Sequence, residues 1–286
     1  MNETFQNSNV FNLGQLYIVA TPIGNLEDIT LRALRVLREA DWIACEDTRQ
    51  TRKLLDHFGI QKPTVSYHDH NEAARAAELV AKLATGQTGA LVSDAGTPLI
   101  SDPGYRLVEA AIAAGIAVVP IPGASAALGA LMASGLPTDT FRFCGFLPAK
   151  SGQRQKLLDS LRHETCTLIF YEAPHRVLHS LEDITETLGA RRVAAARELT
   201  KVHEEILRGT AEEIGHILAA RPSVKGEFTL LIDRAPDREL VSNISVAEAV
   251  EKAEREGLSR MDAIKRVAKE RGLSKRDVYR GVLAGC

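Results

Sequence analysis

Short apolar runs alternate with helix-length amphipathic segments through the first half of this 286-residue chain, and this alternation constrains the fold more than any other feature. Strands are predicted over 15–20, 42–45, 64–67, 89–93 and 117–121, and helices over 28–39, 49–58, 73–83 and 105–114. Asp28 and Thr30 are both suitable N-caps for the first helix. Strands that are joined by such helices make right-handed crossovers, so we predict a mostly parallel sheet.

The spacing changes beyond residue 121, where strands become more frequent and connections longer. Helices are predicted over 124–134, 151–161, 176–188 and 211–220, and strands over 141–146, 167–172, 192–197 and 227–232. We therefore expect a polar leader over 1–14, an N-terminal α/β domain over 15–121 and a second α+β domain over 122–233. The charged segment 233–242 has the composition of a linker.

The last 45 residues differ from the rest in charge. A capping box at Ser245 and Glu248 and two further helices, over 259–269 and from Ser274, predict a helix-turn-helix-like module over 242–286. This module carries about +3 and the remainder about −5, which together give the net charge of −2. The near-neutral total therefore does not argue against a polyanionic partner.

Several common site types are absent from the sequence. The P-loop pattern G-x-x-x-x-G-K followed by Ser or Thr is missing, and no G-x-G-x-x-G follows the first strand. The four cysteines lack zinc-site spacing, and His68 and His70 would point to opposite sides of an extended segment, so no metal is expected. No apolar run reaches membrane-spanning length and no signal peptide precedes the first strand, which favours a cytoplasmic protein.

Five polar or Gly/Pro-rich loops follow the five predicted strands of the first domain, over 21–25, 46–49, 68–71, 93–104 and 122–126. The carboxyl ends of parallel strands share one sheet edge, where open α/β sheets bind their ligands. A ligand site is therefore predicted at this edge. Simpler roles remain open, since Asp94 and Asp102 could make Asx turns and Asp47 could pair only with Arg49.

Nine strings along the chain together resemble one known family. They are TPIGNLEDIT, CEDTR, HDHNE, LVSDAGTPLISDPG, PGASA, GFLPAK, FYEAPHR, ARELTKVHEE and KGEF. In this order they resemble the tetrapyrrole-methylase-like S-adenosylmethionine (SAM) enzymes, and within them the bacterial 16S ribosomal RNA cytidine 2′-O-methyltransferases. The resemblance covers residues 15–232, and the basic tail also has a counterpart there.

The resemblance implies a two-domain α/β fold, with a parallel-sheet N-terminal domain, a mixed α/β second domain and SAM in the cleft between them. It also implies a homodimer that methylates the ribose of a decoding-centre cytidine in 16S rRNA of the small ribosomal subunit. By position it assigns the cofactor contacts to Pro22, Gly24, Asp94, Gly96, Thr97, Pro98, Ile100, Ser125, Ala126, Tyr171, Lys225, Gly226 and Glu227.

A positioned base would assist transfer to a weakly nucleophilic hydroxyl. The sequence does not choose among the candidates Asp47, His68, His70, Asp102 and Lys201. RNA phosphate contacts are expected at Arg49, Arg176, Lys265, Arg266, Lys275 and Arg276. Two rival functions stay open: a corrin-precursor methylase of the same fold, which has no evident use for the basic tail, and a ribosome-binding protein without enzymatic activity.

Overall fold

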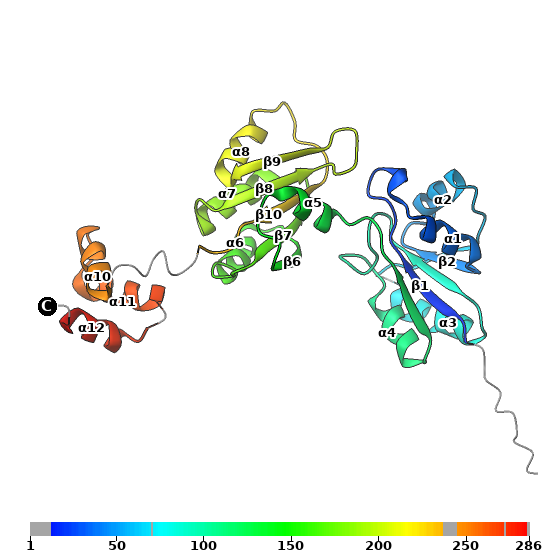
Figure 1. Ribbon diagram of the computed structural model, residues 1–286, viewed down its shortest axis with the longest axis horizontal. Helices are drawn as coiled ribbons and strands as arrows, with labels where there is room; N and C mark the ends of the chain where they lie inside the picture. Colours follow the sequence, from blue (N-terminus) through cyan, green and yellow to red (C-terminus); the bar gives the residue numbers. More distant parts are fainter. Residues whose placement is uncertain (1–12, 70, 237–244, 272, 285–286) are drawn as a thin grey trace, which may run out of the picture. The chain divides into compact units, whose positions relative to one another are not determined.

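The computed structural model describes residues 13–69, 71–236, 245–271 and 273–284. The chain divides into two compact units, the first ending at Arg234 and the second beginning at Ala235 (Figure 1). Two five-stranded sheets lie in the first unit, and helices form the second. The predicted α/β fold class with a helical tail is confirmed.

The first sheet is entirely parallel, as the alternation of strands and helices predicts. Its strand order is β3-β2-β4-β1-β5. The strands are β1 (Gln15–Val19), β2 (Trp42–Cys45), β3 (Thr64–Ser66), β4 (Gly89–Val92) and β5 (Ala117–Ile121). The helices are α1 (Leu31–Glu39), α2 (Thr48–His57), α3 (Glu72–Ala84) and α4 (Tyr105–Ala113), with a 3-10 turn, η1 (Leu26–Asp28), before α1.

Of the two possible N-caps for α1, the structure selects Thr30. Its hydroxyl accepts a hydrogen bond from the Ala33 N–H at 3.0 Å, whereas Asp28 lies in η1. The crossovers through α1 and α2 step toward β3, and those through α3 and α4 step back toward β5. The two pairs of helices therefore cover opposite faces of the sheet.

The second sheet is mixed, with the order β6-β7-β10-β8-β9 and parallel pairing only between β6 and β7. Its strands are β6 (Phe141–Phe146), β7 (Thr167–Glu172), β8 (Arg192–Arg197), β9 (Glu205–Thr210) and β10 (Phe228–Ile232). Helix α5 (Ala126–Ser134) packs on one face, and α6 (Ser151–Ser160), α7 (Val177–Leu188) and α8 (Ala211–Ala219) pack on the other.

The sequence did not predict β9. Its residues Glu205-Ile206-Leu207-Arg208-Gly209-Thr210 show no regular alternation of apolar and polar side chains, and only partial burial. The strand forms because it lies at the sheet edge and completes an antiparallel ladder with β8.

The second unit consists of α10 (Val246–Arg255), α11 (Arg260–Arg271) and α12 (Lys275–Ala284) around a small core that includes Val250, Ile264 and Val278. The predicted capping box is present, since the Glu248 N–H donates to Ser245 Oγ at 3.1 Å and the Ser245 N–H donates to Glu248 Oε2. Among the described residues, no helix has both the length and the apolar character that a membrane crossing requires.

A buried ion pair fixes the segment that follows β6. The Arg154 and Asp183 side chains are only 3% and 7% exposed, and Arg154 Nε donates to Asp183 Oδ2 at 2.6 Å. Arg154 Nη1 also donates to the carbonyl oxygen of Pro148 at 3.1 Å, and Ser151 Oγ donates to Asp183 at 2.9 Å. The pair therefore joins the GFLPAK segment, α6 and α7.

Replacement of Arg154 by alanine should leave the Asp183 carboxylate buried without a partner. We expect Arg154→Ala to lower the free energy of unfolding by about 3–5 kcal/mol, measured by urea denaturation. Arg162→Ala is the matched control, because Arg162 pairs with Asp159 at a site where both side chains are largely exposed. Equal losses for the two variants would contradict the role of the buried pair.

Candidate functional site

One cavity in the first unit has a volume of about 490 Å³ and is lined from both sheets. The loops that follow β4 and β5 supply Asp94, Gly96, Thr97 and Ser125 on one side. Residues of β7, β8 and β10 and the loops beside them supply the other. The volume falls within the range of about 300–1,000 Å³ that is typical of small-molecule sites.

Backbone hydrogen bonds hold the loop after β1 against the loop after β4 at the cavity. The Thr21 N–H donates to the Gly96 carbonyl at 2.8 Å, and the Gly96 N–H donates to the Thr21 carbonyl at 3.0 Å. Thr97 Oγ1 donates to the carbonyl of Ala124, in the loop after β5, at 3.1 Å. Gly96 has φ +85°, which glycine adopts without steric cost. Three loops that are far apart in sequence therefore form one wall.

Two loops that line the cavity, the one after β4 and the one between β8 and β9, contain non-glycine residues in left-handed backbone conformations. Leu99 and Ser101 have φ of 71° and 67°, and Glu198 and Thr200 have φ of 50° and 66°. Such conformations cost of order 1–3 kcal/mol each and concentrate at functional sites. In the described chain these are the four non-glycine residues with positive φ, and all of them lie on loops that line the cavity.

Lys201, in the loop between β8 and β9, forms ion pairs with two carboxylates. Its Nζ donates to Glu198 Oε1 at 2.8 Å and to Glu227 Oε2 at 3.0 Å. Burial alone would lower the pKa of Lys201, but the hydrogen bonds to Glu198 and Glu227 outweigh it and raise the pKa. The ammonium group is therefore held in its charged form.

Gly24 and Gly226 allow this arrangement because they have no side chain. A Cβ at Gly24 would lie 2.3 Å from Lys201 Cγ, and one at Gly226 would lie 2.3 Å from Glu198 Cγ. Gly226 also has φ +90°. These glycines contribute to the site by close packing around Lys201 and Glu198.

Aromatic and aliphatic side chains form the apolar part of the cavity. Tyr171 packs edge-on against Phe143 and Phe146, with ring centroids 4.9 and 5.6 Å apart. Ile100, in the loop after β4, and Leu199, in the loop after β8, also line the cavity. This surface suits a flat ring system on one side of the cavity.

Asp102 is a titratable group of the cavity whose pKa is shifted toward neutrality. Burial raises its pKa to about 6, and the neighbouring Glu46 and Asp94 carboxylates contribute in the same direction. Neither Asp102 nor Asp94 forms an ion pair with any residue that the structure describes, although Asp94 Oδ1 accepts the Asp47 N–H at 3.1 Å. Among the described residues, these two carboxylates of the cavity therefore have no cationic partner, whereas the charge of Lys201 is taken up by Glu198 and Glu227.

The predicted cofactor contacts divide into two groups. Eight line the cavity, namely Asp94, Gly96, Thr97, Ile100, Ser125, Ala126, Tyr171 and Glu227. Five do not line it, namely Pro22, Gly24, Pro98, Lys225 and Gly226. For Lys225, the carbonyl accepts a hydrogen bond from Arg197 Nε at 2.5 Å, which fixes the loop before Glu227. All thirteen assignments stay predictions.

Of the five candidate bases, Asp102 and Lys201 line the cavity and Asp47 and His68 do not. His70 lies outside the described residues. Hydrogen bonds from Arg49 lower the pKa of Asp47 to about 2, which leaves it a poor proton acceptor. Asp47 pairs with Arg49, as the simpler interpretation predicted, and it is also the N-cap of α2. Since Lys201 is held charged, Asp102 is the candidate that the geometry favours.

The predicted RNA-binding residues have different surroundings. Arg49 pairs with Asp47, but its side chain is 87% exposed. Arg176 donates to the fully buried Glu172 carboxylate at 2.7 Å, so part of its donor capacity serves the fold.

The four predicted contacts of the tail also differ from one another. Lys265 pairs with Asp262, and Arg266 pairs with Glu256 and Glu270. Lys275 and Arg276 are exposed on α12 and form no ion pair with the described residues.

The cavity also contains residues that the sequence analysis did not assign. They are Ile23, Ala95, Ser101, Phe146, Glu172, Ala173, Pro174, Ala196, Glu198, Leu199, Phe228 and Thr229. Most of them stand within motifs that carried the family resemblance, such as FYEAPHR and ARELTKVHEE. Glu198 could have been found there, since it stands three residues before Lys201, with which the structure pairs it.

The raised pKa of Asp102 implies a pH-dependent stability. In an unfolded chain the aspartate pKa is about 3.9, so between about pH 4 and 6 the folded state binds more protons and stability falls as pH rises. Asp102→Asn removes the free-energy cost of ionising this buried carboxyl in the folded state. After a discount for partial exposure, we expect the variant to gain about 1–2 kcal/mol relative to the wild type between pH 4 and pH 7.

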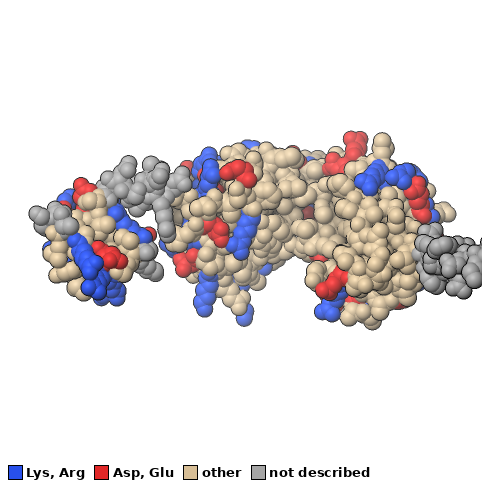
Figure 2. Space-filling view, turned by 60° about the horizontal axis from the view of Figure 1, so that its bottom comes forward, with Lys and Arg blue, Asp and Glu red and all other residues tan. Residues whose placement is uncertain are grey.

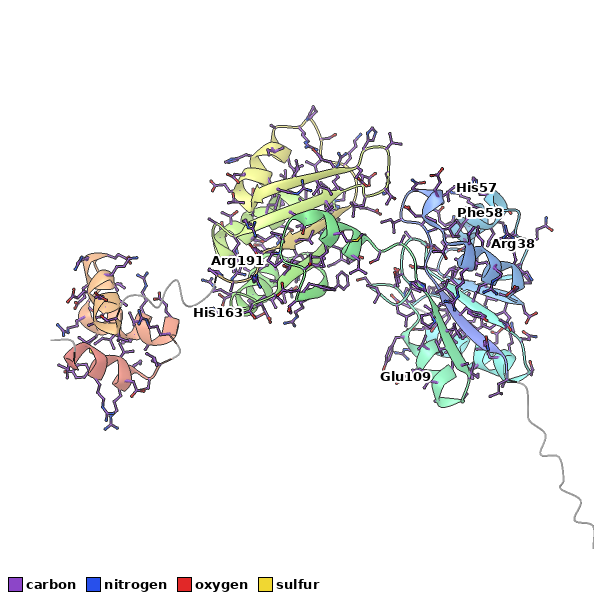
Figure 3. All side chains as sticks on the ribbon, viewed as in Figure 1. Arg38, His57, Phe58, Glu109, His163 and Arg191 are labelled. Carbon is purple, nitrogen blue, oxygen red and sulfur yellow. The ribbon has the colours of Figure 1, made fainter. Side chains whose placement is uncertain are left out.

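Thermal denaturation of both proteins at the two pH values measures this difference. Glu109→Gln, on the exposed surface of α4 (Figure 3), removes a carboxylate away from the cavity and serves as the control. A difference between Asp102→Asn and wild type that does not change with pH would contradict the raised pKa.

The chain is similar to known methyltransferases over most of its length. Residues 15–215 match the family model described as tetrapyrrole (corrin/porphyrin) methylases. A Halalkalibacterium halodurans protein named ribosomal RNA small subunit methyltransferase I is 52% identical over 271 residues, which is 93% of each chain. A Synechocystis protein of the same name is 51% identical over 271 residues, covering 93% of this chain and 96% of its own.

Among solved structures, uroporphyrin-III C-methyltransferase from Thermus thermophilus, complexed with S-adenosyl homocysteine, is similar with a TM-score of 0.52 and 18% sequence identity. The match covers 76% of this chain and 97% of that one. At this identity the similarity establishes a shared fold only.

Proposed function

This chain belongs to the tetrapyrrole methylase family, and on that premise we propose that it is a SAM-dependent methyltransferase acting on 16S rRNA of the small ribosomal subunit. The observation that carries the proposal is the identity of 52% and 51%, over 93% of the chain, to proteins named ribosomal RNA small subunit methyltransferase I. The motif resemblance further favours the ribose 2′-hydroxyl of a decoding-centre cytidine as the methyl acceptor. A cytoplasmic location accords with a ribosomal substrate.

The residues of the cavity fit SAM. When bound, SAM supplies a methyl group on a positively charged sulfonium. Asp94 and Asp102 provide negative charge without a cationic partner among the described residues, which suits a ligand that carries ammonium and sulfonium charges. Ile100, Leu199 and Tyr171 provide an apolar slot for the adenine.

The first turn of α5 suits the anionic end of the same ligand. Ser125 is the N-cap of α5 and lines the cavity together with Ala126. Free backbone N–H groups and the helix dipole favour a carboxylate at such a position.

Asp102 would hold and orient the acceptor hydroxyl and accept its proton. Its pKa near 6 leaves the carboxylate mostly ionised at pH 7, yet close enough to neutrality to accept a proton in the transition state. The strained backbone at Ser101 fixes its position. Lys201, held charged at the cavity wall, suits a phosphate of the RNA, and Arg49 is exposed for the same purpose.

The predicted homodimer has a candidate contact on α5. Ala127, Ala130 and Leu131 of this helix are buried in the core, whereas Leu128 and Met132 are 48% and 82% exposed on another face. Exposed apolar side chains one turn apart support a subunit contact there. On α12 of the second unit, the exposed Lys275 and Arg276 support RNA docking by that module.

The activity can be tested with methyl-labelled SAM and four acceptors: small ribosomal subunits that lack the modification, naked 16S rRNA, a precorrin, and buffer alone. We expect label in the ribosomal acceptor, and digestion to nucleosides should yield 2′-O-methylcytidine. Label in the precorrin alone would make the protein a tetrapyrrole methylase. Transfer to no acceptor would favour a binding protein.

Within this assay, the wild-type rate at saturating SAM should rise with pH through about 6, as Asp102 ionises. Asp102→Asn should lower kcat by about 10²–10⁴-fold and abolish that pH dependence. Its SAM affinity by calorimetry separates a catalytic loss from a binding loss. A kcat within a few-fold of wild type would exclude Asp102 as the base.

A further inference from the structure

We propose that the outer face of helices α1 and α2 binds the phosphate backbone of the RNA that enters the cavity. The inference rests on the RNA substrate proposed above and adds a second contact region on the first unit. We call this surface the α1–α2 face and define it by the exposed cations Arg32, Arg35, Arg38, Arg49, Arg52 and Lys53.

The two helices form one continuous layer. They connect β1 to β2 and β2 to β3, and their apolar side chains enter the same core, through Val36 and Leu37 of α1 and Leu55 of α2. Arg38 and Phe58 lie side by side in Figure 3, and Arg38 Nη2 donates to the Phe58 carbonyl at 3.3 Å. Their outward side chains therefore belong to a single surface.

The charge of this layer differs from that of the layer on the other side of the sheet. Helix α1 carries three arginines and one glutamate, and α2 carries three Lys/Arg and one aspartate, so the pair has a net charge of +4. Helices α3 and α4 carry three Lys/Arg and three Asp/Glu, a net charge of zero. Figure 2 shows Lys and Arg side chains grouped together on one part of the lobe that contains α1 and α2.

Most of these cations are available to a partner. Arg32 and Arg52 form no ion pair with the described residues, and Lys53 donates only to Gln50 at 3.1 Å. Arg35 pairs with Glu39 one turn away, with both side chains more than half exposed. Exposed pairs of this kind contribute about 0–1 kcal/mol, so phosphate can replace the carboxylate at little cost.

The α1–α2 face begins at the cavity. The Asp47 N–H donates to the cavity residue Asp94 at 3.1 Å, and Asp47 is the N-cap of α2. Arg49 follows in the first turn of α2, and Arg52 comes one turn later. Beside the C-terminal half of α2, a second hollow of about 530 Å³ is lined by Arg52 and Lys62 and also by Asp56. An RNA strand that leaves the cavity would therefore meet Arg49, Arg52 and Lys53 along the first two turns of α2.

The test compares two full-length variants that each lose two positive charges. Arg32→Ala with Arg52→Ala alters the α1–α2 face, and Arg75→Ala with Lys82→Ala alters α3 on the opposite layer. Binding to naked 16S rRNA is measured between about 50 and 200 mM salt. We expect the first variant to bind about tenfold more weakly at low salt, with the slope of log K against log salt reduced by about 1.4–1.8.

The control variant should retain the wild-type slope, and both variants should bind SAM as the wild type does. Arg32→Lys with Arg52→Lys keeps the charge and should restore the slope, which separates phosphate binding from a folding defect. An unchanged slope in the alanine variant would overturn the inference, while methyl transfer to rRNA by that variant would leave the proposed function standing. Loss of binding to assembled subunits but not to naked rRNA would point to a ribosomal protein and would also overturn it.

Discussion

The backbone bridge between Thr21 and Gly96 is the interaction on which the candidate site depends. Parallel strands bring their carboxyl ends to one edge, but the edge alone does not shape a cavity. The two hydrogen bonds of the bridge, at 2.8 and 3.0 Å, hold the long loop after β4 against the loop after β1. With that loop held, the strained residues Leu99 and Ser101 can present Ile100 and Asp102 to the cavity.

Within the described chain, unpaired negative charge lies in the cavity, and positive charge lies on the outer helices α1 and α2. Inside the cavity, Asp94 and Asp102 have no cationic partner among the described residues, whereas Glu172 pairs with Arg176 and Glu198 pairs with Lys201. Outside it, α1 and α2 carry an excess of exposed arginines. Such an arrangement suits a cationic small molecule inside and a polyanion outside. The net charge of −2 conceals both regions because it averages over them.

Much of the fold could be predicted from the sequence because its strands and helices have strong local signals. The limits of β5, β6, β7 and β8 agree with the predicted ranges, and the parallel first sheet follows from the alternation. Strand β9 was missed because its ladder with β8, rather than its own pattern, determines it. The choice of Thr30 over Asp28 as N-cap likewise depends on where α1 begins in the folded chain, since both residue types cap helices well.

The candidate site was predictable where the residues stand in the loops themselves, as with Asp94, Gly96 and Ser125. It was not predictable where function depends on pairing across the chain. The pairing of Asp47 with Arg49, two residues away, is one of the roles that the sequence leaves open. Lys201 stays a candidate base by sequence, because the sequence does not show that Glu227, 26 residues away, helps Glu198 to hold its charge. Sequence spacing does not report such contacts between distant segments.

The most direct measurement is a crystal structure of the full chain grown with S-adenosyl homocysteine. The account predicts the ligand in the cavity between the loop after β4 and Tyr171, with its carboxylate at the first turn of α5 and its sulfur toward Asp102. Binding of the ligand outside this cavity, or with its sulfur directed away from Asp102, would contradict the account.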